Sequence, residues 1–299
     1  MEQSVKGRQQ RLAELLEELA PDEGLTTSLL PEVRFMKSLR PNPRAPVIYE
    51  PSIVIVGQGR KIGYLGDQVY TYDAHNYLVL SVPLPFECEC QAEPDEPFLA
   101  FSVRVESALL ADLLLEMDEP GPGGGVLPRG MYSTPLTEDL LGVAVRLLES
   151  LRSPVESRVL GKQAIREIVF RVLQGEQGGS LRALAARHGS FGQIAKVLKR
   201  IHTDYQAALD VETLAGDAGM SVSSFHHNFK AVTSTSPLQY LKNLRLHKAR
   251  MLMAQDGLNA SMAASQVGYA SPSQFSREFK RFFGSSPVEE VQKLRAIRL

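Results

Sequence analysis

Cysteine is scarce in this sequence of 299 residues, where only Cys88 and Cys90 occur. Two thiols exclude a framework of several disulfides and a zinc site with four thiolate ligands. Long apolar runs are absent too, since no stretch approaches the roughly 18 residues that suggest a membrane-spanning helix. The N-terminal residues 1–20 have the pattern of a charged amphipathic helix rather than of a secretion signal. The sequence therefore predicts a cytoplasmic protein without a membrane segment.

The chain also lacks an overall charge of one sign, because 33 Lys and Arg face 34 Asp and Glu. The balance is uneven along the chain. Residues 191–299 hold fourteen basic and eight acidic side chains, a balance of +6, which leaves −7 for residues 1–190. A basic C-terminal third indicates either a polyanionic partner, such as a nucleic acid, or simply a solvated charged surface.

Two kinds of secondary structure divide the chain. Residues 45–105 contain short runs rich in Val, Ile, Tyr and Phe, separated by Gly, Asp, Asn and Pro, which predicts a small antiparallel barrel or sandwich. A helix (106–117), a Gly-rich loop (119–130) and two amphipathic helices (137–151 and 156–175) are expected next. From Phe191 onward only helices joined by short turns are expected. The length supports two domains, residues 1–190 and 191–299.

The C-terminal region contains an internal repeat. VETLAGDAGMSVSSFHHNFKAVTSTSPLQYL, residues 211–241, recurs as ASMAASQVGYASPSQFSREFKRFFGSSPVEEV, residues 260–291. Each copy predicts a helix, a turn, and a second helix, which is the helix-turn-helix layout. Gly219 and Gly268 suit a left-handed turn, and Ser221 and Ser271 suit the N-cap of the second helix.

Paired phenylalanines decide which residues of each second helix face outward. Phe225 and Phe229 lie one turn apart and share a face that must be buried, and Phe275 and Phe279 repeat this spacing. The side chains left facing outward between each pair are His226, His227 and Asn228 in the first copy and Ser276, Arg277 and Glu278 in the second, and just before them come Ser223, Ser224, Ser273 and Gln274. The Arg, Gln, Ser and His members of this set can bond base edges. The cations placed for phosphate contacts, near the far ends of these helices, are Lys230, Lys280 and Arg281.

A single helix is expected between the two copies, over residues 236–255. Its length is roughly 28 Å at 1.5 Å per residue. Successive major-groove faces on one side of DNA are about 34 Å apart. One chain could therefore place both second helices in adjacent major grooves, and the predicted partner is double-stranded DNA.

The segment FSREFKRFFGSSP, residues 275–287, resembles the signature of the AraC/XylS transcriptional regulators, and the resemblance extends over residues 191–290. Residues 1–190 are similar to the cupin-like N-terminal half of one subgroup. The resemblance implies an α+β protein, with a cupin-like β-barrel and flanking helices followed by an all-α domain of two helix-turn-helix motifs joined by a linker helix.

The resemblance further implies a sequence-specific regulator, usually an activator that contacts RNA polymerase, whose N-terminal domain serves effector binding or dimerisation. By motif position, it implies that the base-reading residues are Ser223, His226, His227, Ser273, Gln274 and Arg277. We expect no catalysis, no metal and no cofactor. The effector is an unknown small molecule or electrophile, and a homodimer is plausible. One departure, Ser234 where the second copy has Gly284, predicts a differently shaped loop.

The two cysteines leave several interpretations open. In a strand, Cys88 and Cys90 would share one face about 6.6 Å apart, which is awkward for a disulfide. The alternating Glu87 and Glu89 would tend to hold the thiols protonated. The pair is then either a buried lining of the barrel, a thiol that senses an oxidant or electrophile in the effector pocket, or part of a metal site.

Two other classes of protein compete with a regulator. A cupin-type enzyme needs a multi-histidine ligand set, yet His75 is the only histidine of the barrel region. Adjacent His226 and His227 point about 100° apart on a helix, and GPGGG at 121–125 lacks the Lys-Ser/Thr ending of a phosphate loop. A protein-binding adaptor, whose repeat only packs helices, predicts no affinity for DNA.

Overall fold

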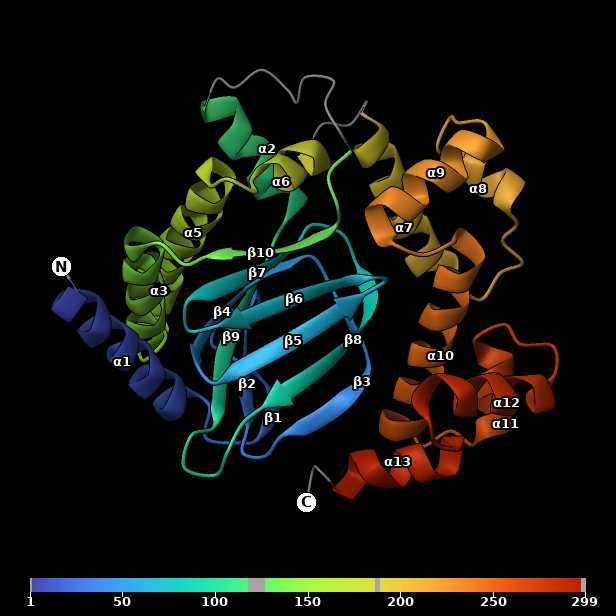
Figure 1. The fold of residues 1–299 in the computed structure, drawn as a ribbon, viewed down its shortest axis with the longest axis horizontal. Coiled ribbons are helices and arrows are strands. Elements are labelled where there is room, and N and C mark those ends of the chain that lie inside the picture. The colour runs from blue at the N-terminus through green and yellow to red at the C-terminus, as the bar shows by residue number, and fades with distance from the viewer. Residues whose placement is uncertain (1, 118–126, 186–188, 297–299) are drawn as a thin grey trace.

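The structure is a computed structural model that describes residues 2–117, 127–185 and 189–296. A curled sheet with helices along one side forms the N-terminal part, and a helical C-terminal part lies beside it (Figure 1). Residues 119–126 of the predicted Gly-rich loop lie outside the described residues. No helix in the described ranges is both long and apolar enough to cross a membrane.

Among the described residues, ten antiparallel strands form one sheet, which curls into a half-barrel. The strands are β1 (Gly24–Thr27), β2 (Val33–Ser38), β3 (Asn42–Tyr49), β4 (Ser52–Gln58), β5 (Arg60–Leu65), β6 (Gln68–Asp73), β7 (Asn76–Leu80), β8 (Leu84–Gln91), β9 (Phe98–Arg104) and β10 (Met131–Pro135). Their order is β1-β2-β9-β4-β7-β6-β5-β8-β3, with β10 also paired to β7. This confirms the predicted barrel over residues 45–105, and adds strands on both sides of that range.

Strand β4, in the middle of the sheet, is buried on both faces, and its residues 53–56 are all apolar. In β4, Ile53 and Ile55 belong to an outer core shared with the flanking helices, and Val54 and Val56 to the inner core of the barrel. The flanking helices are α1 (Glu2–Leu19), α2 (Ser107–Glu116), α3 (Glu138–Ser150), α4 (Pro154–Glu156), the π-helical turn η1 (Ser157–Gly161), α5 (Lys162–Gln174) and α6 (Gly179–Ala185).

The C-terminal part consists of helices in the order that the repeat predicts. They are α7 (Ser190–Asp204), α8 (Val211–Asp217), α9 (Val222–Thr233), α10 (Pro237–Gln255), α11 (Ala260–Gln266), α12 (Pro272–Phe283) and α13 (Pro287–Ala296). Side chains cap them where the sequence places Ser, because Ser221, Ser236 and Ser271 each accept a bond from a backbone N–H of the following first turn. The predicted linker helix is α10.

One expectation about the loops after α9 and α12 is wrong. Ser234 adopts the same left-handed conformation (φ 57°) as Gly284 (φ 75°), and each donates its N–H to a carbonyl four residues back, on Lys230 and Lys280. The two loops therefore share one shape at this position. A serine can take a left-handed conformation at some cost in free energy, and the helix-ending hydrogen bond offsets part of that cost.

Helix α10 attaches the helical part to the barrel. The Tyr240 hydroxyl donates to the Pro83 carbonyl (2.8 Å), and the Gly130 N–H donates to the Val232 carbonyl at the end of α9 (3.0 Å). Further along α10, Arg250 donates to the carbonyl of Pro46 in β3 (3.4 Å). The first helix-turn-helix is thus held directly against the barrel.

Candidate nucleic-acid interface and effector cavity

Both helix-turn-helix motifs show the predicted division into a buried and an exposed face. Phe225, Phe229, Phe275 and Phe279 are fully buried, and the two rings of each pair lie 5.5 Å and 5.4 Å apart. The turns before these helices contain Gly219 and Gly268 with positive φ, as predicted. Because the phenylalanines fix the rotation of α9 and α12, the residues between them are directed away from the core.

The structure exposes every residue predicted to contact DNA. On α9 these are Ser223, His226, His227 and Lys230, and on α12 they are Ser273, Gln274, Arg277, Lys280 and Arg281. Each set lies on one helix and on one exposed face. The side chains offer donors and acceptors first, and cations toward the C-terminal end, which suits base edges and phosphates respectively.

Glu278, to which the sequence assigned no role, lies on α12 among the residues predicted to contact DNA. Glu278 is only 14% exposed and is held by Gln274, Tyr269 and Lys242. Burial acts to raise the pKa of this carboxyl, but the hydrogen bonds from Gln274 and Tyr269 and the charges of Lys242 and Arg281 outweigh it and lower the pKa. Glu278 is therefore an ionised residue on α12, beside the exposed polar side chains.

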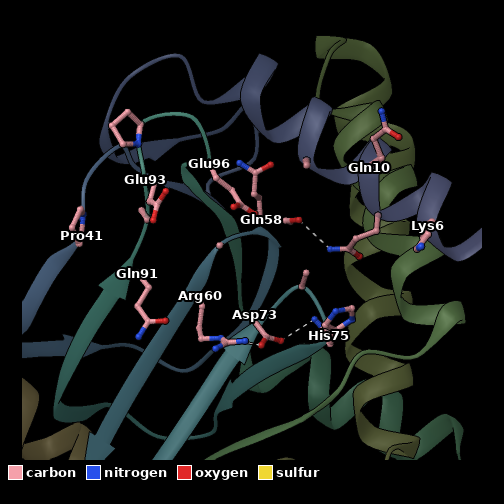
Figure 2. Close-up of a pocket in the computed structure, with 17 residues that line it drawn as sticks. Lys6, Gln10, Pro41, Gln58, Arg60, Asp73, His75, Gln91, Glu93 and Glu96 are labelled. Atoms are coloured by element: carbon pink, nitrogen blue, oxygen red, sulfur yellow. Dashed lines mark hydrogen bonds and ion pairs between the residues drawn. The ribbon is translucent and has the colours of Figure 1, made fainter.

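The end of the barrel nearest α1 opens into a cavity of about 950 Å³. Figure 2 shows its polar lining, in which Lys6 and Gln10 come from α1 and face the ends of several strands. The strand side contributes Gln58, Arg60, Asp73, His75, Gln91, Glu93 and Glu96. A cavity of this volume is of the size that binds small molecules.

Asp73 is held rigidly at this cavity. It accepts the backbone N–H of His75 (2.9 Å) and Arg60 Nε (3.3 Å). Burial acts to raise its pKa, but the bonds from His75 and Asn76 and the charge of Arg60 lower it overall. Within the described residues, no group of three or more His, Cys, Asp or Glu side chains is arranged to hold a metal ion.

The cysteine pair lies inside the barrel rather than on the wall of this cavity. Cys88 is 6% and Cys90 3% exposed, and both are free thiols. Burial raises the pKa of Cys90 to about 11, against the opposing charge of Lys61. The sequence suggested that Glu87 and Glu89 favour the protonated thiol, but the pKa of Cys90 is raised chiefly by burial.

Lys61 is the second residue that the sequence reasoning missed. Its register places it opposite both Tyr72 and Cys90, so it faces the barrel interior. Its Nζ lies 3.4 Å from the Tyr49 hydroxyl and 4.7 Å from the centre of the Phe98 ring. The alternation of β5 could have indicated this position, had the register with β8 been known.

Comparisons with known proteins agree with this architecture. A family model described as the AraC-type transcriptional regulator N-terminus matches residues 29–180, and a helix-turn-helix domain model matches residues 214–293. The chain is 40% identical over 90 residues to the RCS-specific transcriptional activator RclR of Escherichia coli K12, covering 30% of this chain and 32% of RclR.

It is also 27% identical over 147 residues to the transcriptional activator RhaS of an Enterobacter species, covering 42% of this chain and 53% of RhaS. The matched segments thus span from a third to about half of these relatives. A crystal structure of ToxT from Vibrio cholerae with an unsaturated fatty acid bound superposes with a TM-score of 0.58, covering 87% of this chain and 94% of that one. At 12% identity, this likeness shows the fold.

Proposed function

Because the chain belongs to the AraC family of transcriptional regulators, we propose that it binds specific DNA sequences through α9 and α12 and is controlled through its barrel. The observation that carries the proposal is the repeated face. Two helices expose hydrogen-bonding side chains and cations at matched positions, 50 residues apart, over buried phenylalanine pairs. A protein-binding adaptor gives no reason for this match.

The proposal assigns different roles to neighbouring residues of α12. Arg277→Ala should weaken specific binding by about 1–3 kcal/mol and relax the preference at one base position, because arginine can bond guanine through two atoms. Lys280→Ala should weaken binding to all sequences alike and reduce the salt dependence. Titration of fluorescent duplexes at several salt concentrations measures both effects. Equal losses for Arg277→Ala on selected and random DNA would remove it from the base-reading set.

The linker helix supports contact with two adjacent major grooves. Helix α10 has 19 residues, a length of roughly 28 Å at 1.5 Å per residue, against a spacing of about 34 Å between groove faces. We expect protection of two base clusters about one helical turn apart on one side of the duplex. A hydroxyl-radical footprint with a single protected cluster would contradict this arrangement.

The cavity at the barrel end is the proposed effector site. Its polar lining favours a small polar ligand, and ToxT, which has the same fold, was crystallised with a small molecule bound. A metabolite library can be screened for compounds that raise the melting temperature of the protein. A compound that stabilises the wild type and the Gln177→Ala control, but not Gln91→Ala, would locate the site; stabilisation of all three would place the ligand elsewhere.

Thiol sensing by Cys88 and Cys90 stays a hypothesis. An oxidant or electrophile would have to enter the barrel, because both thiols are buried. If Cys88→Ser/Cys90→Ser leaves the response intact under every inducing condition, the thiols are structural.

Transcriptional activation, with a contact to RNA polymerase, is the proposed outcome, since RclR and RhaS are named activators. The site of action would be chromosomal DNA in the cytoplasm, and a homodimer joined through the barrel domain can be tested by sedimentation. Family membership favours this regulator over the cupin-type enzyme as the alternative.

A further inference from the structure

Glu278 joins three elements of the second helix-turn-helix. Its Oε2 accepts the hydroxyl of Tyr269, in the turn between α11 and α12, at 2.9 Å. Its Oε1 accepts Gln274 Nε2, one turn earlier on α12, at 3.1 Å, and lies 3.7 Å from Lys242 Nζ on α10. The Tyr269 ring in turn packs edge-on against the buried Phe275, with 5.3 Å between ring centres. The carboxylate is therefore fixed in place from both sides.

The charge state of Glu278 determines the orientation of the Gln274 amide. The carboxyl is ionised at neutral pH, so it has no hydrogen to donate and can only accept. The atom of Gln274 that bonds to it must be the amide nitrogen, and not the amide oxygen. A glutamine on an open surface can rotate its amide by half a turn at little cost, but Gln274 would lose this hydrogen bond by doing so.

The fixed amide leaves a defined pair of groups available to a ligand. One N–H of this exposed Gln274 amide is occupied by Glu278, whereas its second N–H and its carbonyl oxygen make no hydrogen bond within the part of the chain that the structure describes. Adenine offers an N7 acceptor and an N6 amino donor in the major groove, and a glutamine amide matches both at once. A freely rotating amide would present its donor and acceptor in either order.

On the basis of the DNA-reading function proposed above, we propose that Glu278 is a positioning residue that orients Gln274 to select adenine at one base position. It does so without contacting the base. This role also accounts for a negative charge inside a helix that approaches phosphates, where a carboxylate otherwise opposes binding.

The first helix-turn-helix provides an internal comparison. Asn228 occupies the position equivalent to Glu278 and bonds to the sulfur of Met220, which aligns with Tyr269. The position equivalent to Gln274 is Ser224, which has no amide to orient and bonds to the Ser221 hydroxyl. The adenine selection is therefore expected only from α12, and Asn228→Ala is a matched control.

The test uses the full-length protein and a randomised duplex library, from which bound sequences are selected and counted. The variants are Gln274→Ala, Glu278→Ala, the double variant and Asn228→Ala, with thermal unfolding of each to confirm that it is folded. Wild type should show one adenine-preferring position with discrimination of roughly 5- to 150-fold. Gln274→Ala should lose this preference, and Glu278→Ala should lose most of it at the same position. The double variant should resemble Gln274→Ala, and Asn228→Ala should keep the preference.

Several results would overturn the proposal. If Glu278→Ala binds all sequences more tightly by the same factor and keeps every base preference, Glu278 acts only through its charge. If Gln274→Ala keeps the adenine preference, Gln274 does not read adenine, and Glu278 has no base-reading residue to orient. A wild-type protein that enriches no sequence at all would refute DNA reading itself, a failure distinct from the other two.

Discussion

Tyr240 lies where α7, α10 and the barrel meet, and its hydroxyl can be removed without changing the shape of the ring. The side chain is fully buried. Its hydroxyl donates its one hydrogen to the Pro83 carbonyl at 2.8 Å, so the contact with His202 Nε2 at 2.7 Å requires the imidazole to donate. Tyr240→Phe therefore leaves one acceptor on the barrel and one donor on α7 without their partner.

The expected cost follows from those two groups. Each buried polar group without a partner costs about 1–3 kcal/mol. The His202 side chain is 13% exposed, so water can replace part of its loss. We expect the free energy of unfolding to fall by about 2 kcal/mol. With an unfolding entropy of about 2.1 cal/mol/K per residue over 299 residues, the melting temperature should fall by about 3 °C.

Differential scanning calorimetry measures this change, and Tyr205→Phe is the matched control. Within the described residues, the Tyr205 hydroxyl accepts a hydrogen bond only from the exposed Gln206 amide, at 3.3 Å, so its removal should change the free energy of unfolding by less than about 0.5 kcal/mol. If Tyr240→Phe melts at the same temperature as wild type or as Tyr205→Phe, the hydroxyl does not hold the two domains together and the reasoning is wrong.

Two further predictions concern stability. Gly219 and Gly268 are equivalent left-handed turn residues (φ 63° and 87°). A Cβ on Gly268 would lie 2.5 Å from the Gln206 carbonyl oxygen, whereas the atom nearest to a Cβ on Gly219 would be Gln193 Nε2, at 3.9 Å. Gly219→Ala should cost about 1–2 kcal/mol in urea unfolding, from backbone strain alone, and Gly268→Ala clearly more; equal costs would contradict the close contact. Burial, together with nearby cations, lowers the pKa of His202 to about 4 and of His247 to about 3, from 6.5. Because the unfolded chain takes up these protons at higher pH than the folded chain, the stability from the neutral imidazoles is complete above pH 6.5 and is lost as the pH falls toward 4. Urea midpoints measured across this range should show the loss, and His247→Leu should make the pH dependence weaker. An unchanged pH profile in that variant would exclude His247 as a contributor.

Local signals were sufficient for the helical C-terminal third of the chain. The repeat, the serine caps and the positive-φ glycines depend on neighbours within a few residues, and the structure confirms each of them. The spacing of Phe225 and Phe229 defined the buried face of α9, and hence the exposure of His226 and His227. Their contacts with bases stay predictions, because exposure shows only that a side chain is available.

Ser234 shows where local reasoning about the repeat failed. The sequence suggested a different loop because serine disfavours the left-handed region that glycine adopts easily. The conformation is nevertheless the same as at Gly284, and the end of α9 also makes a bond to a distant segment, from the Gly130 N–H to the Val232 carbonyl. The local sequence thus did not predict this backbone conformation.

The sequence by itself determined the order of a strand-rich part and a helical part, the pair of matched helix-turn-helix motifs and the residues on their exposed faces, because strand alternation, helical periodicity and capping are short-range effects. Only the tertiary structure decided that Lys61 lies opposite Cys90, that burial raises the pKa of the Cys90 thiol, and that Glu278 bonds to Gln274 and Tyr269 and lies near Lys242. Strand register, desolvation and hydrogen bonds between elements depend on which segments meet in space. The pattern of residues along one chain does not specify these contacts between distant segments.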